Sequence, residues 1–361
     1  MNILLFTLEY PPFKGGVANY YENVVRHWPE EDSVFVLNNN DNKLLTDKIR
    51  PRWLPAFYHL YKAVKKENID HILVGNILPL GTVSLVVAKL LGIKFSVFLH
   101  GMDFEYSLKR KRKKILSYLI LKNADKIICV NSYVASLVEK FLPVKNKIVI
   151  SNPGINPYND CDYILTKQIR DKYNLNGKVI FLSIGRMVKR KGFDMAIKAV
   201  KELSDKNIAY FISGNGPDRE EIKSLADGVE NIFFLDNLND PEKWAWLGAC
   251  DCFIMPSRNI SGDVEGFGIV YLEANLMGKP VIAGASGGVG DAVIDGVNGL
   301  MVDPENITDI KRAITEMASD KGLREKLGTQ GEERALREFV WDNLIINLSN
   351  NLKVSPLETS S

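Results

Sequence analysis

The first 28 residues read MNILLFTLEYPPFKGGVANYYENVVRHW, and the elements they predict set the pattern for the whole chain. The apolar run at 3–6 is typical of a buried strand, and the stretch near 16–28 is typical of an amphipathic helix. The loop between them ends in Gly15 and Gly16. A strand, a glycine-containing turn and a helix form the start of a parallel β-α-β unit.

Short apolar runs and helix-length amphipathic segments alternate in the same way along the rest of the chain. In the first half, helices are predicted near 16–28, 79–91, 107–122 and 132–142. Strands are predicted near 2–8, 33–37, 70–74, 94–99, 125–130, 147–150, 178–184, 208–213, 231–235, 252–255, 280–283 and 299–302. This pattern predicts an α/β fold of two doubly wound, Rossmann-like domains.

The alternation breaks at residues 151–176, where Pro, Asn and Asp gather and indicate a crossing between domains. We therefore expect one domain over 1–155 and a second over 156–339. The amphipathic stretch 340–353 is either an ordinary terminal helix or a helix that crosses back onto the first domain. Doubly wound domains bind ligands beyond the carboxyl ends of their strands, so two that face each other across a cleft would place function in the loops there.

Composition excludes several classes of protein. The 361 residues carry 46 Lys and Arg against 44 Asp and Glu, so the chain has no strong overall field and no nucleic-acid partner is expected. The exception is the unbroken basic run Lys109–Lys114, without which the net charge of +2 becomes −4. No apolar stretch reaches the roughly 20 residues of a membrane span, and the N-terminus lacks the features of a signal peptide.

Cysteine and histidine usage predicts a reduced protein in the cytoplasm. Four cysteines in a chain of this length do not form a disulfide framework. Only one residue separates Cys250 from Cys252, and the four histidines are scattered, so we expect no structural metal site.

Two loops have the composition of a phosphate site. Gly15 and Gly16 would let backbone amides approach a phosphate at a helix start, although a turn that needs positive φ would also explain them. Arg186 and Lys191 follow the strand near 178–184 and are five residues apart. Both could converge on one anion, as a clamp on a diphosphate requires, or the loop could simply be basic and solvated.

The stretch DVEGFGIVYLEA at 263–274 places a loop carboxylate, Glu265, ahead of a helix that carries a second one, Glu273. Free amides at 267–270 would point at a phosphate, and the two carboxylates would accept hydrogen bonds from sugar and ribose hydroxyls. Paired carboxylates also occur in glycosidases. The adjoining anion site favours a phosphate leaving group instead.

Together these segments resemble the GT-B glycosyltransferases, and in particular the retaining enzymes of family 4. The resemblance spans nearly the whole chain and rests on Gly15-Gly16, His100-Gly101-Met102-Asp103, the segment 151–156, Arg186 with Lys191, Gly214-Asn215-Gly216 and the E-x7-E element from Glu265 to Glu273. The stretch around 263–274 looks most like mannosyltransferases that use GDP-mannose to extend phosphatidylinositol mannosides.

The resemblance implies roles for individual residues. Arg186 and Lys191 would neutralise the donor diphosphate, Glu265 would hold the donor sugar, and His100 would lie beside the anomeric carbon. Acceptor contacts are implied for Tyr10 and Asp103. The implied donor-binding set is Gly15, Gly16, Gly214, Asn237, Leu238, Gly266, Phe267, Gly268, Ile269, Val270 and Glu273.

Two departures from the family pattern matter. The loop Ser286-Gly287-Gly288-Val289 continues Gly290-Asp291 where the family usually has Pro-Glu, so the contacts of this loop are open. Asp160-Cys161-Asp162 is a D-x-D sequence, but it falls in the crossing between domains. Since Arg186, Lys191 and helix amides supply the positive charge, we expect no metal ion and no other cofactor.

The implied reaction is transfer of a hexose from a nucleotide-diphosphate sugar to a hydroxyl of a glycan or lipid-linked acceptor, with retention of configuration. GDP-mannose is the leading donor, and a UDP-sugar or a GT-B epimerase or phosphorylase activity is the alternative. A dehydrogenase is disfavoured because no G-x-G-x-x-G follows the first strand. The run Lys109–Lys114 predicts either a solvated helix or peripheral contact with the inner face of the cell membrane.

Overall fold

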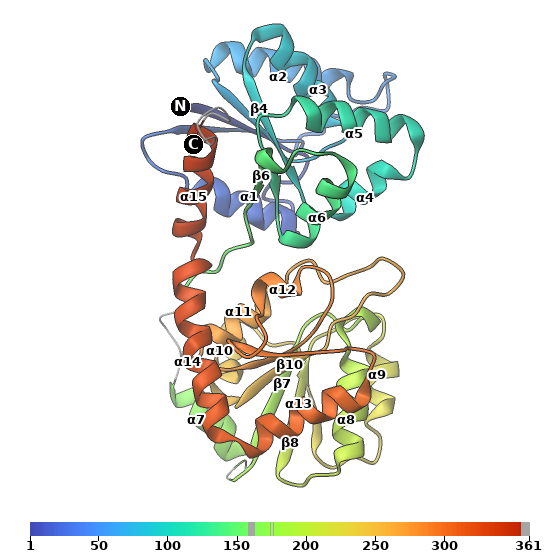
Figure 1. Ribbon diagram of the computed structural model, residues 1–361, viewed down its shortest axis with the longest axis vertical. Helices are drawn as coiled ribbons and strands as arrows, with labels where there is room; N and C mark the ends of the chain where they lie inside the picture. The colour runs from blue at the N-terminus through green and yellow to red at the C-terminus, as the bar shows by residue number, and fades with distance from the viewer. Residues whose placement is uncertain (158–162, 174, 176, 355–361) are drawn as a thin grey trace. The chain divides into compact units, whose positions relative to one another are not determined.

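The structure is a computed structural model that describes residues 1–157, 163–173, 175 and 177–354. Contacts divide the chain into two compact units. Unit 1 consists of Met1–Gly154 together with the segment from Trp341 onward, and unit 2 consists of Ile155–Val340. Both divisions fall within one residue of the predicted boundaries. Figure 1 shows the course of the chain through each unit.

Unit 1 is built on a six-stranded sheet of order β2-β1-β3-β4-β5-β6, in which every pair is parallel. Its strands are β1 (Asn2–Phe6), β2 (Ser33–Leu37), β3 (His71–Val74), β4 (Lys94–Leu99), β5 (Ile127–Cys129) and β6 (Ile148–Ile150). Its helices are α1 (Gly16–Arg26), α2 (Leu54–Lys66), α3 (Leu80–Leu91), α4 (Met102–Leu108), α5 (Lys111–Asn123), α6 (Ser132–Phe141), the 3-10 turn η1 (Lys145–Lys147) and α15 (Trp341–Lys353).

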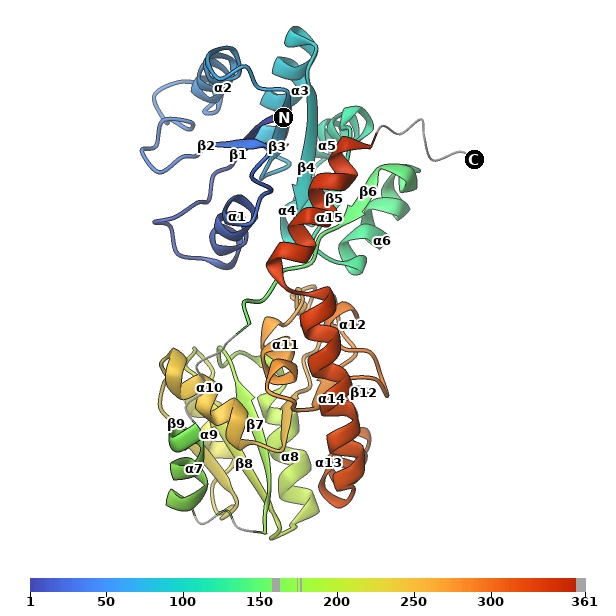
Figure 2. The ribbon, with the colours of Figure 1, turned by 90° about the vertical axis from the view of Figure 1, so that its left-hand side faces the viewer.

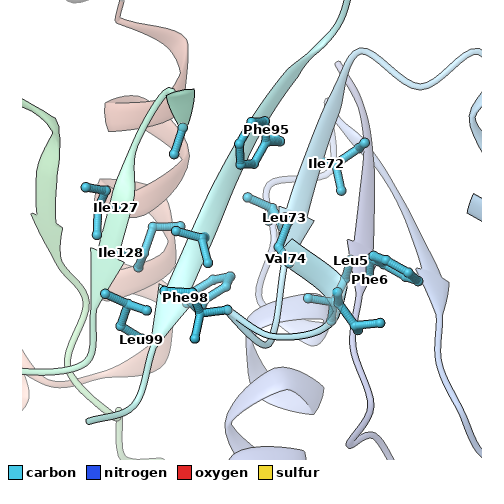
Figure 3. Packing of buried hydrophobic residues seen from close by; sticks show 14 of the residues in the cluster. Leu5, Phe6, Ile72, Leu73, Val74, Phe95, Phe98, Leu99, Ile127 and Ile128 are labelled. Atoms are coloured by element: carbon cyan, nitrogen blue, oxygen red, sulfur yellow. The ribbon is translucent and has the colours of Figure 1, made fainter. Parts of the chain in front are cut away.

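The core of unit 1 lies on both faces of this sheet. Helix α3 contacts α2 and α5 on one face, and α1 contacts α15 on the other (Figure 1). Figure 3 shows apolar side chains that project from the neighbouring strands β1, β3, β4 and β5 and pack together. Helix α15 contributes Trp341, Ile345, Leu348 and Leu352 to the same core. The C-terminal helix is therefore part of the hydrophobic core of unit 1.

Unit 2 repeats the architecture with the order β12-β11-β10-β7-β8-β9, again all parallel. Its strands are β7 (Val179–Ile184), β8 (Ile208–Ser213), β9 (Ile232–Leu235), β10 (Cys252–Met255), β11 (Val281–Gly284) and β12 (Gly299–Val302). Its helices are α7 (Tyr163–Lys172), η2 (Lys189–Lys191), α8 (Phe193–Leu203), α9 (Arg219–Leu225), α10 (Asp240–Ala249), α11 (Ile269–Leu276), α12 (Val289–Ala292), α13 (Ile307–Ser319) and α14 (Lys321–Glu338).

Helices cover both faces of this second sheet as well. Helix α8 contacts α9 and α13, whereas α10 contacts α7 and α11, and α11 contacts α14 (Figure 2). The predicted class of two doubly wound parallel sheets is thus confirmed. In each sheet the strand order reverses at one place. This place lies between β1 and β3 in unit 1 and between β7 and β10 in unit 2. Ligands bind at such switch points.

In unit 1, one predicted helix is divided in the structure and one observed helix was not predicted. The single helix expected near 107–122 is two helices, because Arg110 has an extended backbone with φ −125° and ψ 130° between α4 and α5. Helix α2 was not predicted. Its buried residues Ala56, Leu60 and Val64 are four apart, but Leu54 and Tyr58 are exposed and obscure the amphipathic pattern.

Candidate functional site

An open cavity lies at the carboxyl ends of β7, β8 and β9 in unit 2, where a doubly wound domain binds its ligand. Its volume is about 340 Å³, within the range of small-molecule pockets. It is lined by Ile184, Gly185, Arg186, Ser213, Gly214, Asn215, Asn237, Leu238 and Lys243. Four residues predicted to bind the donor, Arg186, Gly214, Asn237 and Leu238, are thereby brought together.

Lys191 lies next to this cavity. It is the last residue of the 3-10 turn η2, and its Cε is 3.9 Å from the position a Cβ would take on Gly185. Gly185 itself lines the cavity, and the exposed side chain of Arg186 follows it. The loop after β7 therefore carries Arg186 and Lys191 to the same strand end, which is the arrangement that a diphosphate clamp requires.

Glu265 is buried and shares one carboxylate oxygen between two cations. Its Oε2 is 2.7 Å from Nη1 of Arg190 and 2.6 Å from Nζ of Lys191. Arg190 also pairs with the exposed Asp263, with 3.1 Å between Nε and Oδ1. Arg190 was not among the predicted site residues, because the basic turn 189–191 does not reveal which of its three cations points inward.

Helix α11 begins beside Glu265. Gly268 is its N-terminal cap and has φ 86°, a conformation that favours glycine. The amides of Ile269 and Val270 lie in the first turn of the helix, which contains no acidic side chain. Phe267 is buried with its ring 5.7 Å from that of Phe339, whereas Gly266 has open space where a Cβ would stand. The predicted anion-binding turn thus follows a buried residue that packs on Phe339.

Glu273 lies one turn further along α11 and is half-buried. Its Oε1 accepts a hydrogen bond of 2.8 Å from Nζ of Lys243 on α10. Because Lys243 also lines the cavity, this hydrogen bond connects Glu273 to a residue of the cavity wall. Lys243 is a second residue that the sequence did not indicate. It is 30 residues from Glu273 in the sequence and lies on a different helix.

The loop Ser286–Val289, whose contacts the sequence left open, supports Glu265 from behind. The amide of Gly288 donates to the carbonyl of Glu265 at 2.9 Å. A Cβ on Gly287 would come within 2.3 Å of that carbonyl oxygen. The loop therefore holds the backbone of Glu265 and leaves its carboxylate to the two cations.

In unit 1, His100 follows β4 and is held by its surroundings. Its Nε2 is 2.7 Å from the hydroxyl of Tyr21, and the rings of Tyr20 and Tyr21 meet it edge-on. Burial lowers the pKa of His100 to about 4, so the imidazole is neutral at pH 7. A neutral imidazole has one donor and one acceptor nitrogen.

Asp103, the predicted acceptor contact, turns its carboxyl group inward. Its Oδ1 accepts a 3.0 Å hydrogen bond from the amide of His100, and burial raises its pKa to about 6. Its Oδ2 is buried and has no hydrogen-bond partner among the described residues. The structure thus gives Asp103 a clear role in holding the His100 loop.

The loop before α1 holds the remaining predicted residues of unit 1. Gly15 is extended, with φ 175°, and Gly16 is also outside the left-handed region, so the alternative of a left-handed turn is wrong. A Cβ on Gly16 would meet nothing within 4 Å. Tyr10 packs partly against the core, and Glu9 lies beside Gly15 with a pKa raised by burial. Space beside Gly16 is therefore open to a ligand.

The basic run spans the break between α4 and α5. Helix α5 buries Ser117, Ile120 and Leu121 and leaves Ile115 (61% exposed) and Leu119 (41% exposed) uncovered. Leu116, Tyr118, Met102 and Tyr106 are exposed in the same two helices. Basic and apolar side chains thus share this surface.

No group of three or more His, Cys, Asp or Glu side chains that could hold a metal ion occurs within the described residues. The D-x-D sequence at Asp160 and Asp162 lies outside them. Of the helices in the described part of the chain, none is both long and apolar enough to cross a membrane.

Comparison with protein families places this chain among the glycosyltransferases. Residues 14–158 match the family described as Glycosyltransferase Family 4, and residues 166–334 match that described as Glycosyl transferases group 1. The two matches cover most of both units. The chain therefore belongs to the family 4 glycosyltransferases and has their GT-B architecture.

Individual relatives extend over nearly the full length. An uncharacterized glycosyltransferase of Methanocaldococcus jannaschii, MJ1178, is 27% identical and covers 96% of this chain and 97% of its own. The GDP-mannose-dependent alpha-(1-6)-phosphatidylinositol monomannoside mannosyltransferase of Mycolicibacterium smegmatis is 26% identical, with 94% and 95% covered. Anabaena HepE, solved in complex with UDP, has a TM-score of 0.79 at 17% identity, with 98% and 99% covered.

Proposed function

We propose that this glycosyltransferase moves a hexose, with mannose from GDP-mannose as the leading donor, to a hydroxyl of a glycan or lipid-linked acceptor, with retention of configuration. The observation that carries the proposal is the cavity of unit 2. It joins Arg186, Gly214, Asn237 and Leu238 at three strand ends, with Lys191 beside it. Strand-end loops with two cations and exposed backbone suit a nucleoside diphosphate.

The choice of donor rests on relatives that match this chain over nearly its full length. The mannosyltransferases of Mycolicibacterium smegmatis and Corynebacterium glutamicum, 26% and 27% identical, are both named as GDP-mannose-dependent. A UDP-sugar is the alternative, because Anabaena HepE binds UDP on a similar fold. A GT-B epimerase is a further alternative that uses the same kind of donor.

The diphosphate is the leaving group, and its developing charge needs preorganised positive groups. Arg186, Lys191 and the first-turn amides of α11 are proposed to supply them. No carboxylate is assigned as a covalent nucleophile, so the acceptor hydroxyl attacks on the face that the diphosphate leaves. The acceptor proton passes to a phosphate oxygen of the departing group. With this set of cations, we propose that the reaction needs no divalent metal ion.

Both carboxylates of the E-x7-E element have cationic partners within unit 2. Glu265 pairs with Lys191 and Arg190, and Glu273 pairs with Lys243. We propose that the donor diphosphate draws Lys191 away while Arg190 keeps Glu265 in place. Glu265 then accepts hydrogen bonds from hydroxyls of the donor sugar, and Glu273 from those of the ribose.

The surface of α4 and α5 supports docking to an anionic membrane, which would suit a lipid-linked acceptor for an enzyme at the inner face of the cell membrane. Exposed Ile115, Leu116 and Leu119 adjoin the basic run. Basic residues near an anionic leaflet each contribute about 1 kcal/mol, and exposed apolar side chains add burial on docking. These exposed apolar groups favour docking over a merely solvated helix.

The docking proposal is tested by co-sedimentation with phosphatidylglycerol vesicles. Replacing Lys111, Arg112 and Lys113 by alanine removes three charges and should weaken vesicle binding about 100-fold. The matched control replaces the exposed residues Lys206, Lys321 and Lys326 of unit 2 and should leave binding unchanged. Equal binding by both triple variants would refute docking through α5.

The catalytic proposal is tested with purified protein, GDP-mannose or UDP-glucose and an extract of membrane glycolipids. Release of GDP that depends on the added acceptor identifies a mannosyltransferase. Release of UDP instead would change the donor and keep the reaction. Conversion of the donor sugar without any acceptor would show an epimerase and contradict transfer.

A further inference from the structure

The hydroxyl of Tyr21 lies between two groups that cannot both receive its single proton. It is 2.7 Å from the carbonyl oxygen of Gly75 and 2.7 Å from Nε2 of His100. A carbonyl oxygen only accepts, so the hydroxyl proton goes to Gly75. The hydroxyl oxygen is then free to accept, and Nε2 of His100 must be the donor.

Packing around Gly75 fixes this arrangement. Its amide donates to the carbonyl of Phe6 at 2.8 Å, which attaches Gly75 to the end of β1. A Cβ on Gly75 would lie 2.6 Å from Oγ1 of Thr7 and 3.0 Å from Cε2 of Tyr21. Tyr21 is fully buried, so neither the ring nor the carbonyl has room to move apart.

We propose that Tyr21 is a positioning residue that holds His100 as its Nε2–H tautomer, so that Nδ1 offers a lone pair to a substrate hydroxyl. Among the described residues Nδ1 has no hydrogen-bond partner. The low pKa of His100 is consistent with a neutral ring. A lone pair attracts the proton of a sugar or alcohol hydroxyl and repels a phosphate oxygen. This assignment of a hydroxyl ligand rests on the proposed function.

The neighbouring tyrosine provides a matched control. Tyr20 also meets the His100 ring edge-on, with 5.5 Å between centroids against 5.3 Å for Tyr21. Both tyrosines are buried. The hydroxyl of Tyr20, however, donates to Ser151 at 2.9 Å and makes no hydrogen bond to His100. Tyr20→Phe removes an equally buried hydroxyl and leaves the His100 hydrogen bond intact.

The test is long-range ¹H–¹⁵N correlation NMR of the imidazole nitrogens in the full chain at pH 7, with His100 assigned by comparison with His100→Gln. In the wild type, Nε2 should carry the proton and Nδ1 should not. In Tyr21→Phe the Nε2–H loses its acceptor inside an apolar pocket, so the proton should shift toward Nδ1, where water can receive it. Tyr20→Phe should match the wild type.

A wild-type spectrum with the proton of His100 on Nδ1 would overturn the inference. This part of the test needs no variant, so it can be made even if Tyr21→Phe fails to fold. An unchanged tautomer in folded Tyr21→Phe would also overturn it. The spectrum is recorded without the sugar donor or the acceptor substrate. The tautomer of His100 can therefore be determined even if the proposed transfer reaction is not observed. If transfer is observed, Tyr21→Phe should lower kcat about tenfold, as expected for loss of one buried hydrogen bond. Tyr20→Phe should lower it far less.

Discussion

Lys191→Ala should separate ligand binding from stability, because the buried carboxylate of Glu265 has two cationic partners. Removing Lys191 leaves Arg190 at 2.7 Å from Oε2, so Glu265 stays paired. The loss is one charge-assisted hydrogen bond, and the free energy of unfolding should fall by about 1.5–3 kcal/mol. Removing Arg190 as well leaves an unpaired buried carboxylate, for which about 3–5 kcal/mol is expected.

The same substitution should reduce the rate of transfer much more than it reduces stability. Loss of one preorganised positive group from the leaving diphosphate should lower kcat about 100- to 1000-fold. Urea unfolding measures the stability, and acceptor-dependent release of nucleoside diphosphate measures the rate. Lys189→Ala is the control, because Lys189 lies in the same turn but pairs with Glu221 at the surface, where both side chains are more than half exposed. It should change neither quantity appreciably.

Either of two results would contradict these roles of Arg190 and Lys191. If Lys191→Ala alone lowered the free energy of unfolding as much as the double variant, Arg190 would not be an independent partner of Glu265. If Lys191→Ala turned over at nearly the wild-type rate, Lys191 would not act on the diphosphate. Double-mutant analysis of Arg190 and Lys191 would then locate the error, since residues that share one partner are not additive.

Three further predictions concern single residues. Gly154→Ala would place a Cβ 2.5 Å from Cδ2 of Trp341, so urea unfolding should show unit 1 destabilised by about 1–3 kcal/mol. Gly16→Ala meets nothing within 4 Å, so its unfolding should be nearly unchanged while calorimetry shows weaker binding of the donor nucleotide. Burial lowers the pKa of His71 to about 4, below the roughly 6.5 of an unfolded chain, so the unfolded state binds the proton first. The free energy of unfolding should therefore fall by up to about 3 kcal/mol between pH 6.5 and 4, and His71→Gln should flatten this decline.

The strands were predictable because parallel strands buried on both faces are continuous apolar runs. Strands β2, β4, β8, β10 and β12 begin and end at the predicted residues. The break between α4 and α5 was not predictable, because Lys109 and Arg110 are both compatible with a helix and only the extended backbone at Arg110 ends it.

The candidate site was predictable where function follows a strand in the sequence. Arg186 and Asn237 come directly after β7 and β9, and the structure places both at one cavity. Arg190, Lys243 and Tyr21 were missed, because each acts through a partner 30 or more residues away. Such pairs depend on how the sheet brings its loops together, which no local pattern contains. The roles of the predicted residues in donor and acceptor binding stay predictions.

We propose above that the cavity of unit 2 holds the nucleoside diphosphate of the donor through Arg186 and Lys191 without a metal ion. Titration calorimetry with GDP and with UDP in the presence of EDTA tests it most directly. We expect binding that persists in EDTA, is tighter for GDP than for UDP and is greatly weakened in Arg186→Ala. Binding that requires a divalent cation, or that Arg186→Ala leaves unchanged, would contradict it.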